Sequence, residues 1–208
     1  MRETSSQRLA RIKSMQLRIQ GSYAPEDRRG CDDGHWGDKS IGACKRYLRS
    51  LAPNPNPWPK TAEASLKAFY GAACDEQQLT PFTFPYPTRY GGKLVRTGKC
   101  HHKVKDSLLR ALKEIGDRWG DTPGIMEEAE DYGGMWNPRP MRNGTSWSLH
   151  ARGAAIDLDA DDNGNLVHWP TVADMPLEIC EAFAREGWLC AGPFWGRDAM
   201  HFQATSGW

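Results

Sequence analysis

The sequence predicts an α+β fold, in which helices and short strands mix without the regular alternation of a parallel α/β protein. Two kinds of periodicity support this class. Apolar residues recur at three- and four-residue steps in several segments, whereas "AAIDLD" and "MHFQA" alternate in period two. The 21 glycines and 14 prolines divide the 208 residues into short elements. This length allows one domain of ordinary size and a small one.

The first 52 residues predict a small helical unit. Apolar residues at helical spacing predict a helix in residues 1–20: Leu9, Ile12, Met15 and Ile19. Five basic residues accompany them, and we interpret the segment as a solvated helix over a small core rather than a membrane-surface helix. The same spacing predicts a second helix that ends near residue 51: Ile41, Cys44, Leu48 and Leu51.

A proline-rich stretch follows this unit. "APNPNPWPK" has proline at every second position from 53 to 59, which gives a stiff, extended segment that cannot continue a helix. We therefore place a domain boundary here. The predicted organisation is a helical unit in 1–52, a linker in 53–60 and the main domain in 61–208.

The main domain begins with helices and continues with strands. Helices are predicted in residues 61–71, where Gly71 ends the helix, and in residues 104–119. Strands are predicted in 154–159 and 200–204, with a helix in 177–184 between them. Period two places Asp157 and Asp159 on one face of the first strand, and His201 and Gln203 on one face of the second.

The composition excludes several classes of partner. The formal net charge is +1, so no global field draws the chain to nucleic acid or to an anionic membrane. No apolar run approaches the length of a membrane span or of a signal-peptide core, so we expect no membrane anchor and no export signal. The six cysteines form no CxxC pair, and we expect reduced, mostly buried thiols.

A candidate metal site lies in "SLHARGAAIDLDA", residues 148–160. His150 and Asp157 end a segment of small residues, and His201 lies 44 positions after Asp157. Two imidazoles and a carboxylate can bind Zn²⁺ and leave a fourth position for water. Small residues such as Gly153 let the chain turn back so that both ends face one ion. The spacing alone does not distinguish this site from hydrogen-bonded core histidines beside turn aspartates.

Asp198 in "DAMH" precedes His201 by three residues. A carboxylate at this spacing can reach a water at the metal without being a ligand itself. It can accept the proton of that water and pass it to a leaving amine. This arrangement supplies the groups that amide hydrolysis needs.

Other candidate sites are weaker. "DADDNGN" in 159–165 matches the first half of a calcium loop, but its twelfth position is Pro170 instead of glutamate, so we interpret it as a turn. The remaining histidines have no ligand partner at a suitable spacing and are expected at the surface or in capping roles: His35, His101, His102 and His168. Among the tryptophans near the site, Trp188 is expected in the core and Trp195 in a substrate groove.

The site segments resemble a known family. "SLHARGAAID" fits the SxHxxGxAxD signature of the zinc D-alanyl-D-alanine carboxypeptidase family, which includes VanY-like and endolysin peptidases and shares its fold with the hedgehog signalling domain. "DAMHFQA" fits the second signature of the family. "FPYPTRYGGKLVRTGKCHHKVKDSL" and "YGGMWNPRPMRNGTSWSLH" look like opening segments of phage-encoded members. The resemblance spans about residues 61–205 and implies a hedgehog/D,D-peptidase-like domain.

The resemblance also implies roles for single residues. The zinc ligands would be His150, Asp157 and His201. Asp198 would be the general base, at a position where many relatives have glutamate. The family uses an upstream arginine to polarise the scissile carbonyl, which implies Arg142 here, with Arg139 as the alternative. Substrate contacts are expected from Arg139, Ser148 and Trp195.

The N-terminal unit has a resemblance of its own. "DDGHWGDKSIGACKRYL" is similar to the DGxxGxxTxxAxxxFQ core of small helical peptidoglycan-binding domains, although the closing FQ is missing. Wall binding and a purely structural cap on the peptidase are both compatible with this segment.

These resemblances imply a zinc-dependent, endolysin-type peptidoglycan peptidase. It would cleave an amide bond in the stem peptide or cross-bridge, such as L-alanyl-D-glutamate. The alternatives are a D,D-carboxypeptidase that trims terminal D-alanine and a non-catalytic wall-binding virion protein. We expect a monomer, made in the cytoplasm of an infected bacterial cell, that acts on the wall after release or as part of the virion.

Overall fold

The computed structural model describes residues 3–141 and 144–207. Its helices are α1 (Ser5–Arg18), α2 (Asp38–Leu51), α3 (Glu63–Tyr70), α4 (Lys105–Trp119), α5 (Pro123–Glu130), α6 (Leu177–Arg185) and α7 (Ala191–Trp195). Its strands are β1 (Leu79–Tyr90), β2 (Lys93–His101), β3 (Tyr132–Gly134), β4 (Ala155–Leu158), β5 (Leu189–Cys190) and β6 (His201–Gln203). These elements confirm the predicted α+β class.

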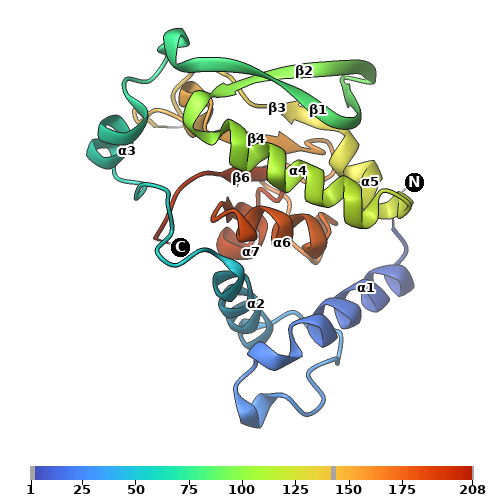
Figure 1. Ribbon diagram of the computed structural model, residues 1–208. Coiled ribbons are helices and arrows are strands. Elements are labelled where there is room, and N and C mark those ends of the chain that lie inside the picture. Colours follow the sequence, from blue (N-terminus) through green and yellow to red (C-terminus); the bar gives the residue numbers. More distant parts are fainter. Residues whose placement is uncertain (1–2, 142–143, 208) are drawn as a thin grey trace.

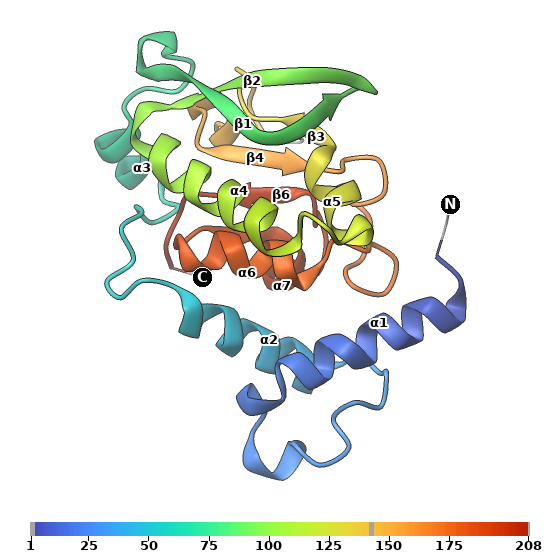
Figure 2. The ribbon, with the colours of Figure 1, turned by 45° about the vertical axis from the view of Figure 1, so that its right-hand side comes forward.

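The strands form two antiparallel sheets. The long β1–β2 hairpin is one sheet, and the other has the order β3-β4-β6-β5. Both ribbon views show the hairpin on one side of the four-stranded sheet and α6 with α7 on the other (Figure 1, Figure 2). The helices α1 and α2 lie beyond α6, farthest from the hairpin. The sheet that carries the site residues is therefore enclosed in the interior.

Periodicity located most of the helices but missed the hairpin. The helices α1, α2, α3, α4 and α6 and the strands β4 and β6 lie where they were predicted. Prolines at 81, 85 and 87 argue against a strand, because proline cannot donate to the ladder. In β1 these prolines are all exposed, and the pairing register shifts between Thr83 and Thr88. Pro85 and Pro87 lie in this irregular stretch, outside the regular ladder, whereas Pro81 is paired with Lys99.

The N-terminal helices share one continuous core with the rest of the chain. Cys44 and Leu48 of α2 have no exposed surface and belong to the same buried cluster as Phe183 of α6 and Phe202 of β6. The rings of Phe183 and Phe202 stack with their centroids 4.4 Å apart. Burial of apolar surface thus stabilises the N-terminal region and the main domain together.

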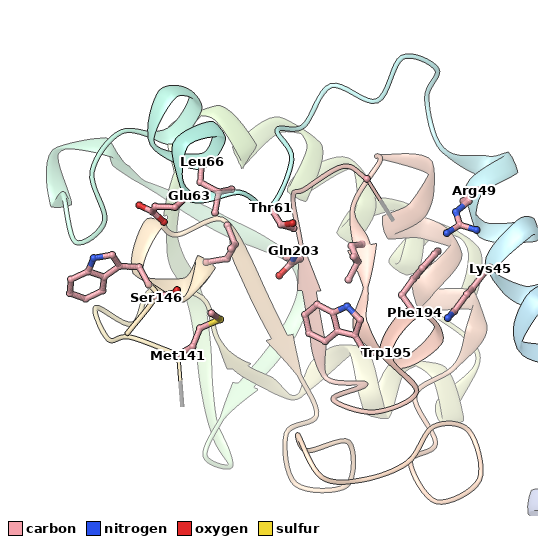
Figure 3. A pocket seen from close by; sticks show the side chains of 14 residues that line it. Lys45, Arg49, Thr61, Glu63, Leu66, Met141, Ser146, Phe194, Trp195 and Gln203 are labelled. Atoms are coloured by element: carbon pink, nitrogen blue, oxygen red, sulfur yellow. The ribbon is translucent and has the colours of Figure 1, made fainter. Parts of the chain in front are cut away.

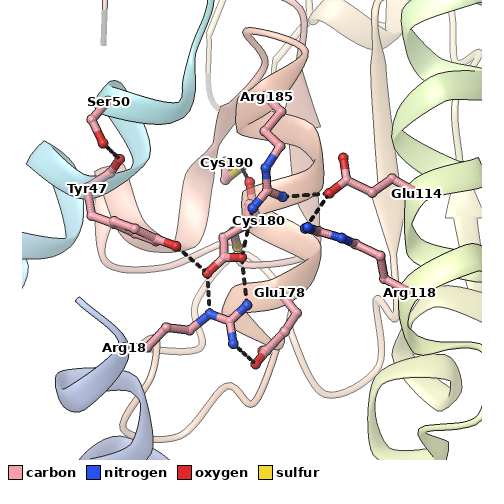
Figure 4. A network of polar contacts seen from close by, with 10 residues as sticks. Arg18, Tyr47, Ser50, Glu114, Arg118, Glu178, Cys180, Arg185 and Cys190 are labelled. Carbon is pink, nitrogen blue, oxygen red and sulfur yellow. Dashed lines mark hydrogen bonds and ion pairs between the residues drawn. The ribbon is translucent and has the colours of Figure 1, made fainter.

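A buried carboxylate anchors α1 and α2 to α6 (Figure 4). The side chain of Glu181 has no exposed surface, and both of its oxygens accept hydrogen bonds from Arg18 of α1. Tyr47 of α2 donates to the same carboxylate at 2.9 Å, and Arg185 donates at 3.3 Å. A fully buried carboxylate needs such partners, because loss of its hydration is otherwise uncompensated.

The proline-rich segment 53–60 is docked against the main domain. The indole of Trp58 is buried and donates to the carbonyl of Glu186 at 2.7 Å. Asn56 donates to the carbonyl of Gly187 at 2.9 Å. The extended conformation of the segment agrees with its prolines, while its side chains fix it to the end of α6.

We expect a truncated chain that begins at Lys60 to be less stable than the full chain by about 3 kcal/mol or more. The truncation removes Arg18 and Tyr47 from the buried Glu181, and breaking a buried ion pair costs about 3–5 kcal/mol. It also exposes the apolar surface of α6 that α2 covers. Thermal unfolding of the two chains at equal metal concentration measures the difference. Equal midpoints would instead show that residues 1–52 form a separable unit, as the prolines predict.

Two further features concern the predicted environment of the chain. No helix in the described residues is both long and apolar enough to span a membrane. All six cysteines are free thiols, and five of them are buried. Burial raises the pKa of Cys100 to about 12, which makes this thiol a poor nucleophile.

Candidate metal centre

His150 is positioned by a short helical turn, η5 (Leu149–Arg152). The hydroxyl of Ser148 caps the turn by accepting a hydrogen bond from the backbone amide of His150 at 3.2 Å. The turn ends at Gly153 with φ of 62°, and a Cβ there would lie 2.8 Å from the backbone nitrogen of His101. Both the left-handed backbone and this close approach require glycine. The chain can therefore reverse directly into β4.

The register of β4 and β6 brings the other two predicted ligands together. Asp157 on β4 lies directly opposite His201 on β6, and the neighbouring pair, Ile156 and Phe202, points into the core. Directly opposed side chains in an antiparallel pair are about 5 Å apart at Cβ. Residues distant in sequence therefore converge where η5 meets the sheet.

The three predicted ligand atoms form a nearly equilateral triangle. Oδ1 of Asp157 lies 3.1 Å from Nε2 of His150 and 3.0 Å from Nδ1 of His201. The two imidazole nitrogens are 3.1 Å apart. Ligands at about 2.0–2.2 Å from one tetrahedral ion lie about 3.3–3.6 Å from each other. The predicted group His150, Asp157 and His201 comes within a few tenths of an ångström of this spacing and is a candidate metal site.

The far nitrogen of each ring fixes the tautomer. Nδ1 of His150 lies 3.1 Å from the carbonyl of Met135, and Nε2 of His201 lies 3.1 Å from the side-chain oxygen of Gln203. A carbonyl oxygen only accepts hydrogen bonds, so these ring nitrogens must donate. When the rings are neutral, the lone pairs of the other two nitrogens point into the triad and are available to a metal ion, whereas a protonated ring donates to Asp157 instead. Metal-binding histidines typically have such a hydrogen-bond partner on the ring nitrogen that does not bind the metal, and it fixes the orientation of the ring.

The electrostatics of the three converging side chains favour positive charge beside Asp157. Burial opposes ionisation of Asp157, but the hydrogen bonds and charges of both histidines outweigh it and hold the pKa of this carboxyl below its usual range. Burial also disfavours a charged His201, yet contact with Asp157 raises the pKa of this imidazole. Both shifts indicate that an unneutralised triad is unfavourable. A divalent cation held by His150, Asp157 and His201 would supply positive charge and suits this nitrogen and oxygen donor set.

Asp198 lies in the turn that precedes β6, with a left-handed φ of 61°. Its backbone carbonyl accepts a hydrogen bond from the amide of His201 at 2.9 Å, which ties the turn to the strand. Its Oδ1 atom is buried and has no hydrogen-bond partner among the described residues. Burial raises the pKa of the carboxyl, and the charge of His201 opposes this effect. An unpartnered carboxylate oxygen beside the triad can accept a proton.

A cavity of about 540 Å³ adjoins the triad (Figure 3). Its lining includes Gln203, the partner of His201, and Leu149, the neighbour of His150. Trp195 also lines it, half-exposed, and its ring stacks on His201 with the centroids 5.7 Å apart. Trp188 is fully buried, which confirms its prediction as a core residue. Substrate binding by Trp195 stays a prediction that its position permits.

The structure gives no substrate contact for the predicted arginines or for Ser148. Arg142 lies outside the described residues. Arg139 is half-buried and donates to the carbonyl of Pro140 at 3.2 Å. Ser148 is buried as the cap of η5, so its observed contact positions His150. The catalytic and substrate-binding roles of these three residues stay predictions.

The other histidines lie outside the triad. His101 is buried, its Nε2 is 2.9 Å from the carbonyl of Tyr70, and its Nδ1 accepts from the amide of Lys103. This contact confirms a capping role. His35 and His168 are exposed. Neither belongs to a group of candidate ligands in the part of the chain that the structure describes.

The segment 159–165 forms the predicted turn but has a further role. The strand β4 ends at Leu158, so Asp159 does not continue the face of Asp157, as period two suggested. Asp159 instead joins Glu128 and Asp174 in a second group of carboxylates. The buried amide of Asn163 donates to all three, while burial and then Asp159 raise the pKa of Glu128 to about 10. A proton and an amide therefore relieve the repulsion within this group.

Sequence reasoning missed two supports of the site. The period-two pattern placed Gln203 on the same strand face as His201, so the contact between Gln203 and the His201 ring could have been predicted from the sequence. The carbonyl of Met135 carries no side-chain signal and could not be found in this way. The cavity wall also includes α2 residues that no local pattern connects with the triad.

Comparison with known families supports the candidate metal site. Residues 142–204 match the profile of a family described as D-alanyl-D-alanine carboxypeptidase. The matched segment contains the whole triad and Asp198, so the similarity to that family covers the residues of the candidate metal site. No curated protein and no solved structure matched the chain. The match confirms the family resemblance for this segment, and the endolysin role and the wall-binding unit stay predictions.

Proposed function

We propose that this protein is a zinc-dependent peptidase that hydrolyses an amide bond in the peptides of peptidoglycan, as an endolysin or virion-associated enzyme of a phage. The observation that carries the proposal is the triangle of ligand atoms on His150, Asp157 and His201, within a segment that matches a D-alanyl-D-alanine carboxypeptidase family. These three side chains would hold the ion. When bound, zinc polarises a carbonyl group and acidifies a coordinated water.

The protein's own groups would divide the remaining tasks. Asp198 accepts the proton of the attacking water at its unpartnered Oδ1 and returns it to the leaving amine. Gln203 and the carbonyl of Met135 keep both imidazoles oriented through the cycle. Arg142 stabilises the negative charge that develops on the carbonyl oxygen, with Arg139 as the alternative.

The bond that is cleaved separates the two enzymatic candidates. In Figure 3 the cavity lining extends on both sides of Gln203, from Ser146 at one end to Phe194 at the other. Lining on both sides supports an endopeptidase that binds residues on either side of the scissile bond. The description of the matched family favours a carboxypeptidase that removes terminal D-alanine.

Mass spectrometry of purified sacculi after incubation with the zinc-loaded protein tests the proposal. An endopeptidase is expected to produce fragments with new internal amino termini, whereas a carboxypeptidase releases free D-alanine. Heat-inactivated protein provides the control. If intact, zinc-loaded protein releases neither product, the proposed activity is wrong and a non-catalytic wall protein is favoured.

A further inference from the structure

The cavity beside the metal centre is walled on one side by the N-terminal region. Lys45 and Arg49 of α2 line the cavity together with Phe194 of α7 (Figure 3). The opposite end is lined by Glu63 and Ser146 (Figure 3). Residues outside the matched segment therefore form part of the space in which a substrate would lie.

The two ends of the cavity differ in charge. Glu63 is neutralised by an ion pair with the buried Arg152 at 2.5 Å. Lys45 is half-buried, and no carboxylate of the described residues lies within ion-pair distance of it. The guanidinium of Arg49, one helical turn further along α2, lies 5.3 Å from the centre of the Phe194 ring. The α2 end therefore presents the ammonium group of Lys45 to the cavity.

The proposed substrate matches this polarity. A peptidoglycan stem peptide has free carboxylates, at its D-glutamate branch and at its C-terminus. A cavity of about 540 Å³ is large enough for a few residues of such a peptide. A lysine ammonium carries three donors for a carboxylate, and hydrogen bonds between charged groups are stronger than neutral ones.

We propose that Lys45, with Arg49 beside it, binds a carboxylate of the stem peptide and so selects the substrate. The helix α2 would then contribute to substrate specificity, in addition to packing against the main domain. The inference rests on the proposed function, because it assumes a peptidoglycan peptide in the cavity.

The experiment compares soluble stem peptides cleaved by the zinc-loaded full chain. One peptide has all carboxylates free, and two others have the D-glutamate or the C-terminal carboxylate converted to an amide. We expect one of the amidated peptides to have a KM about tenfold or more above that of the free peptide. Loss of a charge-assisted hydrogen bond of about 1.5–3 kcal/mol accounts for this change. The identity of that peptide reveals which carboxylate is bound.

Variants assign the effect to Lys45. For Lys45→Gln the KM of the free peptide should rise to that of the discriminating amidated peptide, so that the variant no longer distinguishes the two peptides. Its kcat should change little. Lys45→Arg retains a cation and should retain the discrimination. Lys113→Gln, at an exposed lysine on α4, is the matched control and should resemble the wild type.

Two outcomes overturn different claims. If Lys45→Gln discriminates as well as Lys113→Gln does, the inference is wrong while the peptidase assignment stands. If the wild type cleaves none of the peptides, the proposed activity is wrong, and calorimetric titration then tests the inference separately. Equal affinity of the wild type for free and amidated peptides would overturn it.

Discussion

Replacing His201 with alanine is expected to remove most of the bound zinc and to abolish hydrolysis of peptidoglycan. The change leaves two ligands, His150 and Asp157, and opens a space beside Trp195. Mutation of second-shell partners alone typically costs 10- to 100-fold in metal affinity, so loss of a ligand should cost more than about 100-fold. Metal content after dialysis, measured by mass spectrometry, quantifies the effect.

A graded series makes this expectation specific. His150→Ala should behave as His201→Ala does. Gln203→Leu should lower zinc affinity by about 10- to 100-fold, because it removes the acceptor for the ring of His201 but leaves all three ligands. His35→Ala, at an exposed histidine far from the triad in sequence, is the control and should retain one equivalent. Full retention of zinc in both ligand variants would disprove the metal centre.

The second large effect is expected at Asp198. In Asp198→Asn the amide has nearly the same shape as the carboxylate and keeps one acceptor oxygen, but it cannot take up a proton near neutral pH. General acid–base groups contribute about 10²–10⁴ in rate, so turnover of purified peptidoglycan should fall at least about 100-fold. Zinc content and thermal stability should stay close to those of the wild type, because Oδ1 has no partner to lose among the described residues.

The control for this variant is Asp161→Asn, at an exposed aspartate of the 159–165 turn. It makes the same chemical change at an aspartate outside the triad and should leave activity intact. Loss of zinc together with activity in Asp198→Asn would make Asp198 a ligand or a structural support. Undiminished turnover would exclude it as the general base.

The metal centre was predictable from sequence because its residues sit in two short segments with clear local patterns. Period two placed Asp157 and His201 on strands, and the small residues around Gly153 indicated a tight reversal. The same pattern wrongly placed Asp159 on the face of Asp157, because Asp159 has a left-handed backbone conformation that ends the strand. Local periodicity predicts an element well but does not detect the residue at which tertiary contacts end it.

The connection between the N-terminal helices and the main domain was not predictable in this way. Glu181 lies within a helix of ordinary appearance, and its burial depends on Arg18, which is 163 positions earlier. Lys45 reaches the cavity only because α2 packs on α6 and α7. Such contacts follow from packing between distant segments, and prolines that resemble a linker gave no sign of them.

The pairing of β4 with β6 links metal binding to the completeness of the fold. His150 and Asp157 belong to one local loop, but His201 lies 44 residues beyond Asp157 and joins them only when the two strands pair. An unfolded chain therefore has no complete set of ligands, and free metal favours the folded state by mass action. At about a thousandfold excess over the dissociation constant this linkage contributes about 4 kcal/mol. An ion bound by the three side chains would therefore also stabilise the pairing of β4 with β6 in the middle of the sheet.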